Sequence, residues 1–430
     1  MIDIPKCPVP NGSIKGGADL KKQSNKIAYI SAQVPWGRGE TFIIEEMLAI
    51  KKLGTEIVII PRSPTKEIFH PEAQTLLENS IWLPLINLKM MVNFFISFLT
   101  KPRLWKVLSS IICHSRTWRN LAKNLAVLPK GVYITDLLKE KGVKHIHAHW
   151  SSTTSTLAYI FSQLTGIPWS FTAHSEMILQ NNMIKEKVKT ASFVRAISKR
   201  RCEDLLRIAG QSYQDKVFVL HMGVSVPPYD IVVSKTIRQS KRNIIGCMAM
   251  LDIIKGHRYL INACYILKQQ GFNYKCLIIG EGKERRELEA LVNSLKLNTE
   301  VELVGQLSHS KVINILSEDK IDVLVLPSIA LPLKKRAEGI PVALMEAMAD
   351  GIPVISTATG SIPELLGGNS GILVPEKNPE ALAEAIKKVL TDHKLREKLI
   401  RQGYEKVSTE FNIKLIAQNL VKYFEGENSK

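Results

Sequence analysis

The segment EGIPVALME, residues 338–346, follows an apolar run at residues 321–327 and precedes Gly351. The apolar run predicts a buried strand. The segment predicts the start of a helix, because proline favours a first helical position and glycine the position just beyond a helix end. Glu338 then lies in the loop before the helix and Glu346 lies inside it. Free backbone amides at a helix start attract anions. Two carboxylates beside such a helix start suit a molecule that carries sugar hydroxyls and phosphates.

Strand and helix patterns alternate along most of the chain. Strand patterns occur at residues 27–33, 56–60, 144–149, 169–173, 193–197, 216–221, 243–249, 275–280, 300–305, 321–327, 353–357 and 372–375. Helix patterns occur between them, for example at residues 40–53, 151–165, 257–270 and 283–295, and a long one closes the chain at residues 395–424. Apolar strands connected by helices predict an α/β fold with parallel, doubly wound sheets covered on both faces.

These elements form two sets, which predict two domains. The first set covers residues 25–225 and the second residues 243–405, joined by a polar linker at residues 226–242. We expect residues 1–24 to be loose and residues 406–430 to form a helix that returns towards the first domain. Two facing domains would leave a cleft at the carboxyl ends of their strands, where open parallel sheets bind ligands.

The composition fits a globular protein with an anionic partner. The 430 residues are 45% hydrophobic, so the core needs no disulfide or metal to hold it. The six cysteines form no Cys-x-x-Cys pair and the chain start lacks an apolar signal segment, so we expect reduced thiols in a cytoplasmic protein. The net charge of +18 implies nucleic acid, an anionic membrane face or a phosphorylated substrate as partner.

Residues 79–135 form a block without Asp or Glu. Its basic and aromatic residues are Lys89, Lys101, Arg103, Lys106, Arg116, Arg119, Lys123 and Lys130, with Trp82, Phe94, Phe95, Phe98, Trp105 and Trp118. Proline and polar residues interrupt its most apolar part, so a membrane-spanning helix is not expected. The mixture instead predicts a helix that lies in the interface of an anionic bilayer. Core-facing helices with solvated basic backs remain the alternative.

The second half of the chain resembles the donor domain of glycosyltransferase family 4, which has the GT-B fold. The matching segments are KGH (255–257), IIGEG (278–282), residues 301–305, residues 338–347, GIPV (351–354) and LVP (373–375). The first half is similar to the colanic-acid and amylovoran-type exopolysaccharide glycosyltransferases through ETFI (40–43), HAHW (147–150), FTAH (171–174) and HMGV (221–224). The resemblance implies two Rossmann-like domains that face each other across a cleft.

The resemblance implies a role for each matching residue. Glu338 would hold hydroxyls of the donor sugar and Glu346 the ribose hydroxyls of the nucleotide. Lys255 would neutralise the diphosphate as a point charge. The backbone of four consecutive residues would meet the sugar and the diphosphate, namely Gly339, Ile340, Pro341 and Val342.

Glycines in two loops are further candidates for donor binding. Gly37 and Gly39 follow the first strand, where glycine lets the backbone approach a diphosphate closely, although a plain turn is the alternative. Gly282 belongs to a loop expected near the nucleotide base. The sequence departs from the family pattern at Met250, where the family has an arginine. Either another residue supplies the missing donor, with Arg38, Lys334, Lys335 and Arg336 as candidates, or donor binding is weaker.

Four histidines lie on or next to two predicted strands. His145, His147 and His149 alternate and so share one face of a strand. Such a set could bind zinc or copper, but no further ligand-rich segment is near it in the sequence, so we expect no metal. His149 would line the acceptor side of the cleft and His145 would be a packing residue. By resemblance His174 would lie near the transferring sugar, donating to a hydroxyl or steadying developing charge; a buried structural histidine is the alternative.

The resemblance therefore implies a retaining, metal-independent glycosyltransferase without a cofactor. It would move a sugar from a nucleoside diphosphate sugar to a lipid-linked glycan in bacterial exopolysaccharide or lipopolysaccharide biosynthesis. We expect it in the cytoplasm, peripheral on the inner face of the cell membrane. A catalytically silent GT-B protein that binds sugar or scaffolds an assembly is the alternative. A sugar epimerase would need no membrane block, and a nucleic-acid partner ranks last because no nucleic-acid-binding module is recognisable.

Overall fold

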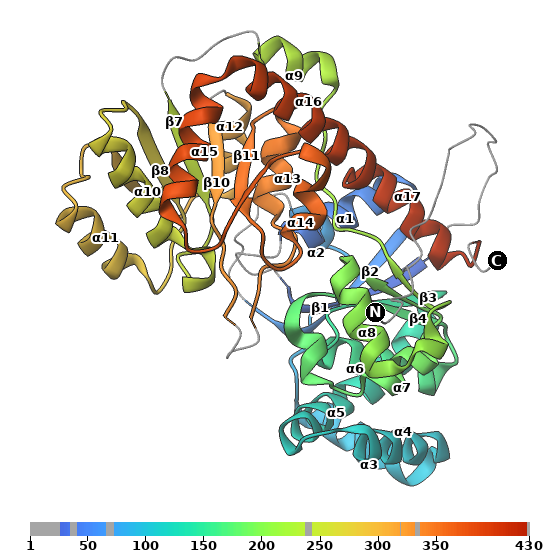
Figure 1. The fold of residues 1–430 in the computed structure, drawn as a ribbon. Helices are drawn as coiled ribbons and strands as arrows, with labels where there is room; N and C mark the ends of the chain where they lie inside the picture. Colours follow the sequence, from blue (N-terminus) through green and yellow to red (C-terminus); the bar gives the residue numbers. More distant parts are fainter. Residues whose placement is uncertain are drawn as a thin grey trace. The chain divides into compact units, whose positions relative to one another are not determined.

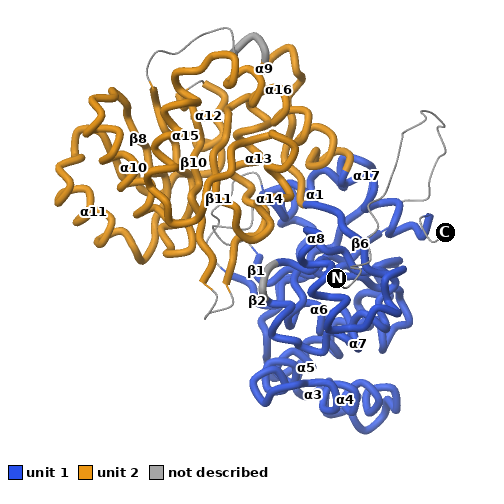
Figure 2. Tube along the Cα trace, viewed as in Figure 1, with its two compact units in different colours: residues 1–221, 416–430 blue, residues 222–415 orange. Residues whose placement is uncertain are grey.

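The computed structural model describes residues 26–34, 41–65, 73–236, 243–318, 320–331 and 336–427. The chain forms two compact units (Figures 1 and 2). Unit 1 comprises residues 1–221 with 416–430, and unit 2 comprises residues 222–415. The predicted loose segment 1–24 and the glycines Gly37 and Gly39 lie outside the described residues.

Each unit contains a six-stranded sheet whose hydrogen-bonded strands all run parallel. The unit 1 strands, in the sheet order β2-β1-β3-β4-β5-β6, are Glu56–Pro64, Lys26–Val34, His145–His149, Trp169–Ala173, Phe193–Ala196 and Val217–Val219. The unit 2 strands, in the sheet order β12-β11-β10-β7-β8-β9, are Ile372–Val374, Val354–Thr357, Val323–Leu326, Ile244–Met248, Lys275–Ile279 and Val301–Gly305. Two doubly wound Rossmann-like domains are therefore confirmed.

Successive residues of a strand point to opposite faces of its sheet. The unit 1 strands carry apolar residues on both faces, so helices cover both. Ile27 and Tyr29 of β1 pack in one buried cluster with α1 and α17, whereas Ala28 and Ile30 pack in another with the helices of the opposite face. The unit 1 helices are α1 (Thr41–Lys52), α2 (Gln74–Leu77), α3 (Leu88–Thr100), α4 (Pro102–His114), α5 (Trp118–Glu140), α6 (Thr153–Thr165), α7 (Ile184–Thr190), α8 (Lys199–Ala209) and most of α17 (Ile413–Phe424).

The basic and aromatic block forms α3, α4 and α5, with α3 and α4 at one edge of unit 1 (Figure 1). Phe98 of α3 and Trp105 of α4 bring the two helices together, with ring centroids 4.0 Å apart. One basic residue of the block is not at the surface. Lys130 is fully buried and its Nζ donates to the carbonyl of Leu83 at 2.7 Å. Burial, with some help from Arg62, lowers the pKa of Lys130 to about 7.

The unit 2 sheet is likewise enclosed by helices, and its buried residues form one cluster. The helices are α9 (Tyr229–Thr236), α10 (His257–Gln269), α11 (Arg285–Ser294), α12 (His309–Ser317), α13 (Val342–Ala349), α14 (Ile362–Leu366), α15 (Pro379–Thr391) and α16 (His393–Glu410). Among the described residues, none of the helices of either unit is both long and apolar enough to cross a bilayer.

The twelve predicted strands are all present, with ends shifted by up to four residues, but three finer expectations are wrong. The segment predicted as a polar linker contains helix α9. The predicted closing helix is two helices, α16 and α17. At the turn between them, the backbone N–H of Val224 donates to the carbonyl of Phe411, and the N–H of Ile413 donates to the carbonyl of Val224. Pro341 precedes α13 as its cap residue, and the helix begins one residue later.

Candidate active site

Lys255 and Glu338 meet at the carboxyl edge of the unit 2 sheet. Lys255 ends a short 3-10 turn, η4 (Ile253–Lys255), after β7, and Glu338 lies in the loop between β10 and α13. Lys255 Nζ lies 2.9 Å from Glu338 Oε1 and 2.8 Å from Oε2, and Ser328 Oγ donates to Oε2 at 3.3 Å. The strand order reverses between β7 and β10, which is the position where open parallel sheets bind ligands. We call these three residues the Lys255 cluster.

Close backbone contacts hold the loops around the Lys255 cluster in place. Gly256 follows Lys255 with φ of +69°, and a Cβ there would lie 1.9 Å from the carbonyl oxygen of Pro327. A Cβ on Gly282 would lie 2.4 Å from the carbonyl oxygen of Leu251, so the loops after β7 and β8 touch through their backbones. Glycine is therefore required sterically at both positions. The expected nearness of Gly282 to a nucleotide base stays a prediction.

The start of α13 lies directly after Glu338. Gly339 faces open space, since a Cβ there would meet nothing within 4 Å, whereas Ile340 packs partly against the core. Val342 is the first helical residue, so its amide and the next two have no partner within the helix. Glu346 lies one turn further on and its Oε1 is 2.7 Å from Nε2 of His309, the first residue of α12.

Met250, where the family arginine is expected, is 62% exposed. Of the proposed substitutes, Arg38, Lys334 and Lys335 lie outside the described residues. Arg336 Nη2 lies 3.4 Å from Oδ1 of Asp252, the residue that caps the turn carrying Lys255. A guanidinium group is thus present next to the Lys255 cluster, although it comes from a different loop than the family pattern implies.

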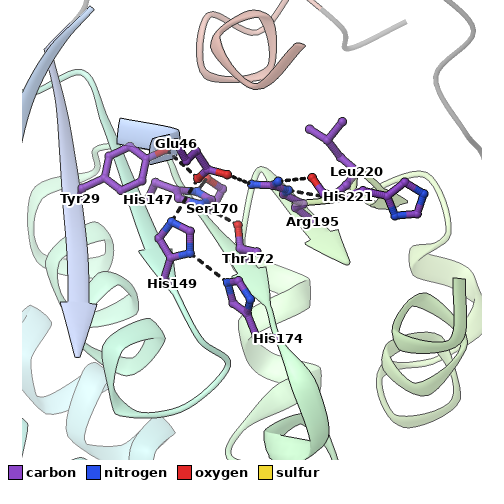
Figure 3. A network of polar contacts seen from close by, with 10 residues as sticks. All are labelled: Tyr29, Glu46, His147, His149, Ser170, Thr172, His174, Arg195, Leu220 and His221. Carbon is purple, nitrogen blue, oxygen red and sulfur yellow. Dashed lines mark hydrogen bonds and ion pairs between the residues drawn. The ribbon is translucent and has the colours of Figure 1, made fainter. Parts of the chain in front are cut away.

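A second polar network lies at the carboxyl edge of the unit 1 sheet (Figure 3). His149 ends β3 and His174 directly follows β4, with His149 Nδ1 and His174 Nε2 2.9 Å apart. His149 Nε2 lies 3.1 Å from Oε1 of Glu46 on α1. Figure 3 shows Arg195 of β5 on the other side of Glu46, where its Nη1 binds Oε2. We call Glu46, His149, His174 and Arg195 the unit 1 network.

Charge compensation stabilises the unit 1 network, in which Glu46, His149 and Arg195 have no exposed surface. Burial alone would raise the pKa of Glu46, but Arg195 and His149 outweigh it and hold that pKa well below its ordinary value. Arg195 also donates through Nε to the carbonyl of Leu220 at 2.8 Å and through Nη2 to that of His221. Burial holds the pKa of His174 well below its ordinary value, with the positive charge of Arg195 adding to the effect.

His145 and His147 belong to the packing of unit 1. His147 Nδ1 contacts Ser170 Oγ at 2.7 Å and its Nε2 contacts Thr172 Oγ1 at 2.9 Å. The Phe424 ring of α17 lies 5.1 Å from His145 and 5.2 Å from His147. Burial lowers the pKa of His145 to about 3, so the ring is neutral near pH 7. Both side chains are thus neutral, hydrogen-bonded and covered by the closing helix.

Glu46, His147 and His149 each offer a possible metal-ligand atom, and these atoms lie within 4.8 Å of one another. The donor set is nevertheless committed to other partners. His147 uses both ring nitrogens on hydroxyl groups, and His149 lies between Glu46 and His174. Arg195 already supplies positive charge to Glu46, so a divalent ion would have to displace a buried guanidinium. The residues present do not fit a metal centre.

Sequence analysis did not single out three titratable residues that contact the predicted site residues. They are Glu46 and Arg195 of the unit 1 network, and His309 beside Glu346. Arg195 carries a signal in retrospect, because a lone arginine in the apolar strand β5 needs a buried anionic partner. Glu46 resembles any other acidic residue of an amphipathic helix. His309 begins a helix after a serine cap and carries no signal of its own.

Replacing Arg195 tests the buried ion pair. Arg195→Met leaves the Glu46 carboxylate buried without a cation, which costs roughly 3–5 kcal/mol of stability at pH 7. In the wild type Glu46 contributes stability above its ordinary pKa of 4.5 that is lost as the pH falls. In the variant burial raises its pKa, so stability is instead lost as the pH rises. The urea-unfolding midpoint of the variant should therefore increase from pH 7 to pH 5, whereas that of the wild type should not.

Arg285→Met is the matched control, because Arg285 pairs with Glu281 and Glu289 at the surface. Such pairs contribute at most about 1 kcal/mol, so a small pH-independent loss is expected. Parallel pH profiles for the wild type and Arg195→Met would contradict a buried ion pair at Glu46.

Comparisons with known proteins find a family match in the second half of the chain. Residues 231–406 match the family model described as glycosyl transferases group 1. The chain is 41% identical over 175 residues to the putative colanic acid biosynthesis glycosyltransferase WcaL of Salmonella typhimurium, over 40% of this chain and 42% of the relative. It is 34% identical over 212 residues to the amylovoran biosynthesis glycosyltransferase AmsK of Erwinia amylovora, over 49% of this chain and 51% of the relative. The chain thus spans about half the length of the curated relatives it matches.

A solved structure covers nearly the whole chain. Anabaena HepE in complex with UDP superposes with a TM-score of 0.67 at 16% identity, over 94% of this chain and 100% of the other. At this identity the likeness shows the fold alone, which is GT-B. Residues 231–406 thus match the glycosyl transferases group 1 family within a chain of GT-B fold, and the chain is similar to glycosyltransferases of colanic acid and amylovoran biosynthesis.

Proposed function

We propose that this protein transfers a sugar from a nucleoside diphosphate sugar to a lipid-linked glycan in polysaccharide biosynthesis, with retention of anomeric configuration. The names of the relatives WcaL and AmsK support exopolysaccharide biosynthesis, and the UDP bound to HepE supports a nucleotide donor. The acceptor class and the stereochemistry follow from the family resemblance of residues 243–392.

The observation that carries the proposal is the contact between Lys255 and Glu338. The side chains of Lys255 and Glu338 are 18% and 11% exposed, so a ligand has access to both. Each group now satisfies the charge of the other. A nucleoside diphosphate sugar offers the same two kinds of partner, because its diphosphate is an acceptor for Lys255 and its sugar hydroxyls are donors for Glu338. The donor would therefore replace one ion pair by two charge-assisted interactions.

In the proposed reaction the bond from the anomeric carbon to the diphosphate oxygen breaks, and a bond from that carbon to the acceptor oxygen forms on the same face. The proton of the acceptor hydroxyl passes to the departing diphosphate. The protein's contribution is positioning and stabilisation of the negative charge that develops on the diphosphate. Lys255 and the amides at the start of α13 would supply that stabilisation, which is why we propose that no metal is required.

A catalytically silent GT-B protein is the competing candidate, and the exposed Met250 motivates it. It predicts that nucleoside diphosphate sugars bind but are not turned over. A thermal-shift panel of nucleoside diphosphates and their sugars, followed by measurement of diphosphate release with the donor found, separates the two candidates.

Glu338→Gln tests the proposed site. The amide keeps the size of the side chain but loses charge-assisted hydrogen bonds worth about 1.5–3 kcal/mol, so kcat/KM for the donor should fall roughly 10- to 100-fold. Glu300→Gln is the matched control, because Glu300 pairs with Lys268 at 3.0 Å elsewhere in the same unit, and it should leave kcat/KM unchanged. Unchanged turnover in a folded Glu338→Gln protein would remove Glu338 from the site.

We further propose that α3 and α4 hold the enzyme on the anionic cytosolic face of a membrane. Six apolar residues of α3 point outward with helical spacing, so they form one stripe. The stripe consists of Leu88, Met91, Val92, Phe95, Ile96 and Leu99, and three of them are more than 60% exposed. A soluble surface rarely leaves so large an apolar face uncovered.

Charge at the edge of this stripe favours a lipid surface over a second protein as its occupant. Arg103 and Lys106 of α4 are exposed and flank Trp105, whose ring packs on Phe98 of α3. Lys101 is less available, because its Nζ lies 3.4 Å from Asp136. Exposed cations beside an apolar stripe suit anionic headgroups above acyl chains.

Vesicle binding distinguishes the two parts of this surface. Phe95→Gln/Leu99→Gln should weaken binding to both neutral and anionic vesicles, because it removes apolar burial. Arg103→Ala/Lys106→Ala should weaken only binding to anionic vesicles, by about 30-fold at roughly 1 kcal/mol per charge. Lys394→Ala/Lys398→Ala, which removes two exposed charges from α16, is the control and should change neither. Salt-insensitive binding that all variants share, or a dimer that Phe95→Gln/Leu99→Gln dissociates, would reject membrane docking.

A further inference from the structure

The unit 1 network contains two histidines in direct contact, and their hydrogen positions follow from their neighbours. We propose that Glu46 and His149 are positioning residues that fix the tautomer of His174, so that His174 Nδ1 accepts a hydrogen bond from a substrate hydroxyl. The contacts within the network determine this tautomer, whereas the identity of the hydroxyl as part of a sugar rests on the proposed function.

The first step is the proton on His149 Nε2. Among the described residues this nitrogen has no partner in hydrogen-bond geometry, and its nearest charged atom is Glu46 Oε1 at 3.1 Å. Glu46 is ionised next to Arg195, and an ionised carboxylate only accepts. A lone pair on Nε2 would be repelled by the carboxylate at this distance. The hydrogen of His149 therefore lies on Nε2.

The second step is the charge of His149. Arg195 already balances Glu46, and the side chains of both have no exposed surface. A positive His149 would add an uncompensated charge to a site without solvent, which is costly. His149 is therefore neutral, so its Nδ1 carries a lone pair and accepts. The 2.9 Å contact then requires that His174 Nε2 carries a hydrogen and donates it.

The third step is the free nitrogen of His174. This ring is buried in the same network and neutral, so its Nδ1 carries a lone pair. No described residue forms a hydrogen bond with Nδ1. The rings of Phe42 and Trp150 lie against His174, with centroids 5.4 Å and 4.6 Å away, so they restrict which way its edge can meet a ligand. A group that meets this nitrogen must bring its own hydrogen.

This constraint selects the chemistry of the ligand. A neutral acceptor binds hydroxyl or amide groups and repels the oxygens of a phosphate, which carry lone pairs and negative charge. His174 thus differs from Lys255 of unit 2, which suits a phosphate. Within the proposed function, His174 recognises a sugar hydroxyl of the donor or acceptor and does not stabilise charge on the diphosphate.

The tautomer is measured directly in the full-length protein with histidine labelled at its ring nitrogens with 15N. Two-bond proton–nitrogen correlation spectra distinguish the Nε2–H form, the Nδ1–H form and the charged ring, and His174→Gln and His149→Gln assign the signals. At pH 7 the wild type should show both His149 and His174 as neutral Nε2–H forms. A charged ring at either position, or an Nδ1–H form of His174, would overturn the proposal.

Glu46→Gln supplies a second test through a reversal. The amide oxygen should turn to Arg195, which only donates, so the amide NH2 faces His149 Nε2. That nitrogen must then accept, and both histidines should switch to the Nδ1–H form. Glu46→Asp keeps an acceptor-only side chain and should keep the wild-type tautomers. A merely structural role would make the two variants alike. A folded Glu46→Gln protein with unchanged tautomers would contradict the proposed effect of Glu46 on His174 through His149, which we call the relay.

Thr172→Val is the matched control, because it removes the hydroxyl group at His147 Nε2, outside the relay, and should leave His174 unchanged. Turnover is assayed separately. In Glu46→Gln, kcat/KM should fall by up to about 10-fold, since the substrate hydroxyl would then have to turn and accept from an N–H group, and Glu46→Asp should recover most of the loss. The expected tautomers in a wild type without sugar transfer would retain the relay and reject the proposed function. Sugar transfer by a protein with the opposite tautomers would retain the proposed function and reject the relay.

Discussion

The order of strands in each sheet reverses beside its first strand, and the clusters of polar residues collect at that reversal. In unit 2 the reversal lies between β7 and β10, whose following loops carry Lys255 and Glu338. In unit 1 the reversal lies between β1 and β3. Strand β1 is followed by α1, which carries Glu46, and β3 ends at His149. Loops diverge where connections leave in opposite directions, so side chains and ligands find room there. Topology thus determines where chemistry can occur in both units.

The two units use carboxylates in different ways because their burial differs. The pair of Lys255 and Glu338 keeps some exposure to solvent, so a ligand can reach it and replace it. The pair of Arg195 and Glu46 has no exposure, so removing either partner leaves a buried charge. The first pair suits a binding site that exchanges partners. The second suits a permanent support that fixes the orientation of neighbouring histidines.

The sequence predicts most of the fold because parallel strands buried on both faces leave continuous apolar runs. It also singles out Glu338 and Glu346 through the pattern of a helix start, and Lys255 through the family resemblance of its segment; the roles of these three residues in donor binding stay predictions. It does not predict that Arg195 pairs with Glu46, which lies 149 residues away in the chain, because only the folded sheet brings them together. The break between α16 and α17 escapes for the same reason, since Val224 supplies its hydrogen bonds from a distant segment.

The central claim is that the Lys255 cluster binds an activated sugar. A crystal structure of the protein with a bound nucleoside diphosphate sugar tests it most directly. We expect Glu338 oxygens within hydrogen-bonding distance of sugar hydroxyls and Lys255 Nζ within the same distance of a diphosphate oxygen. A donor bound elsewhere, with the ion pair still closed at 2.8–2.9 Å, would contradict the account.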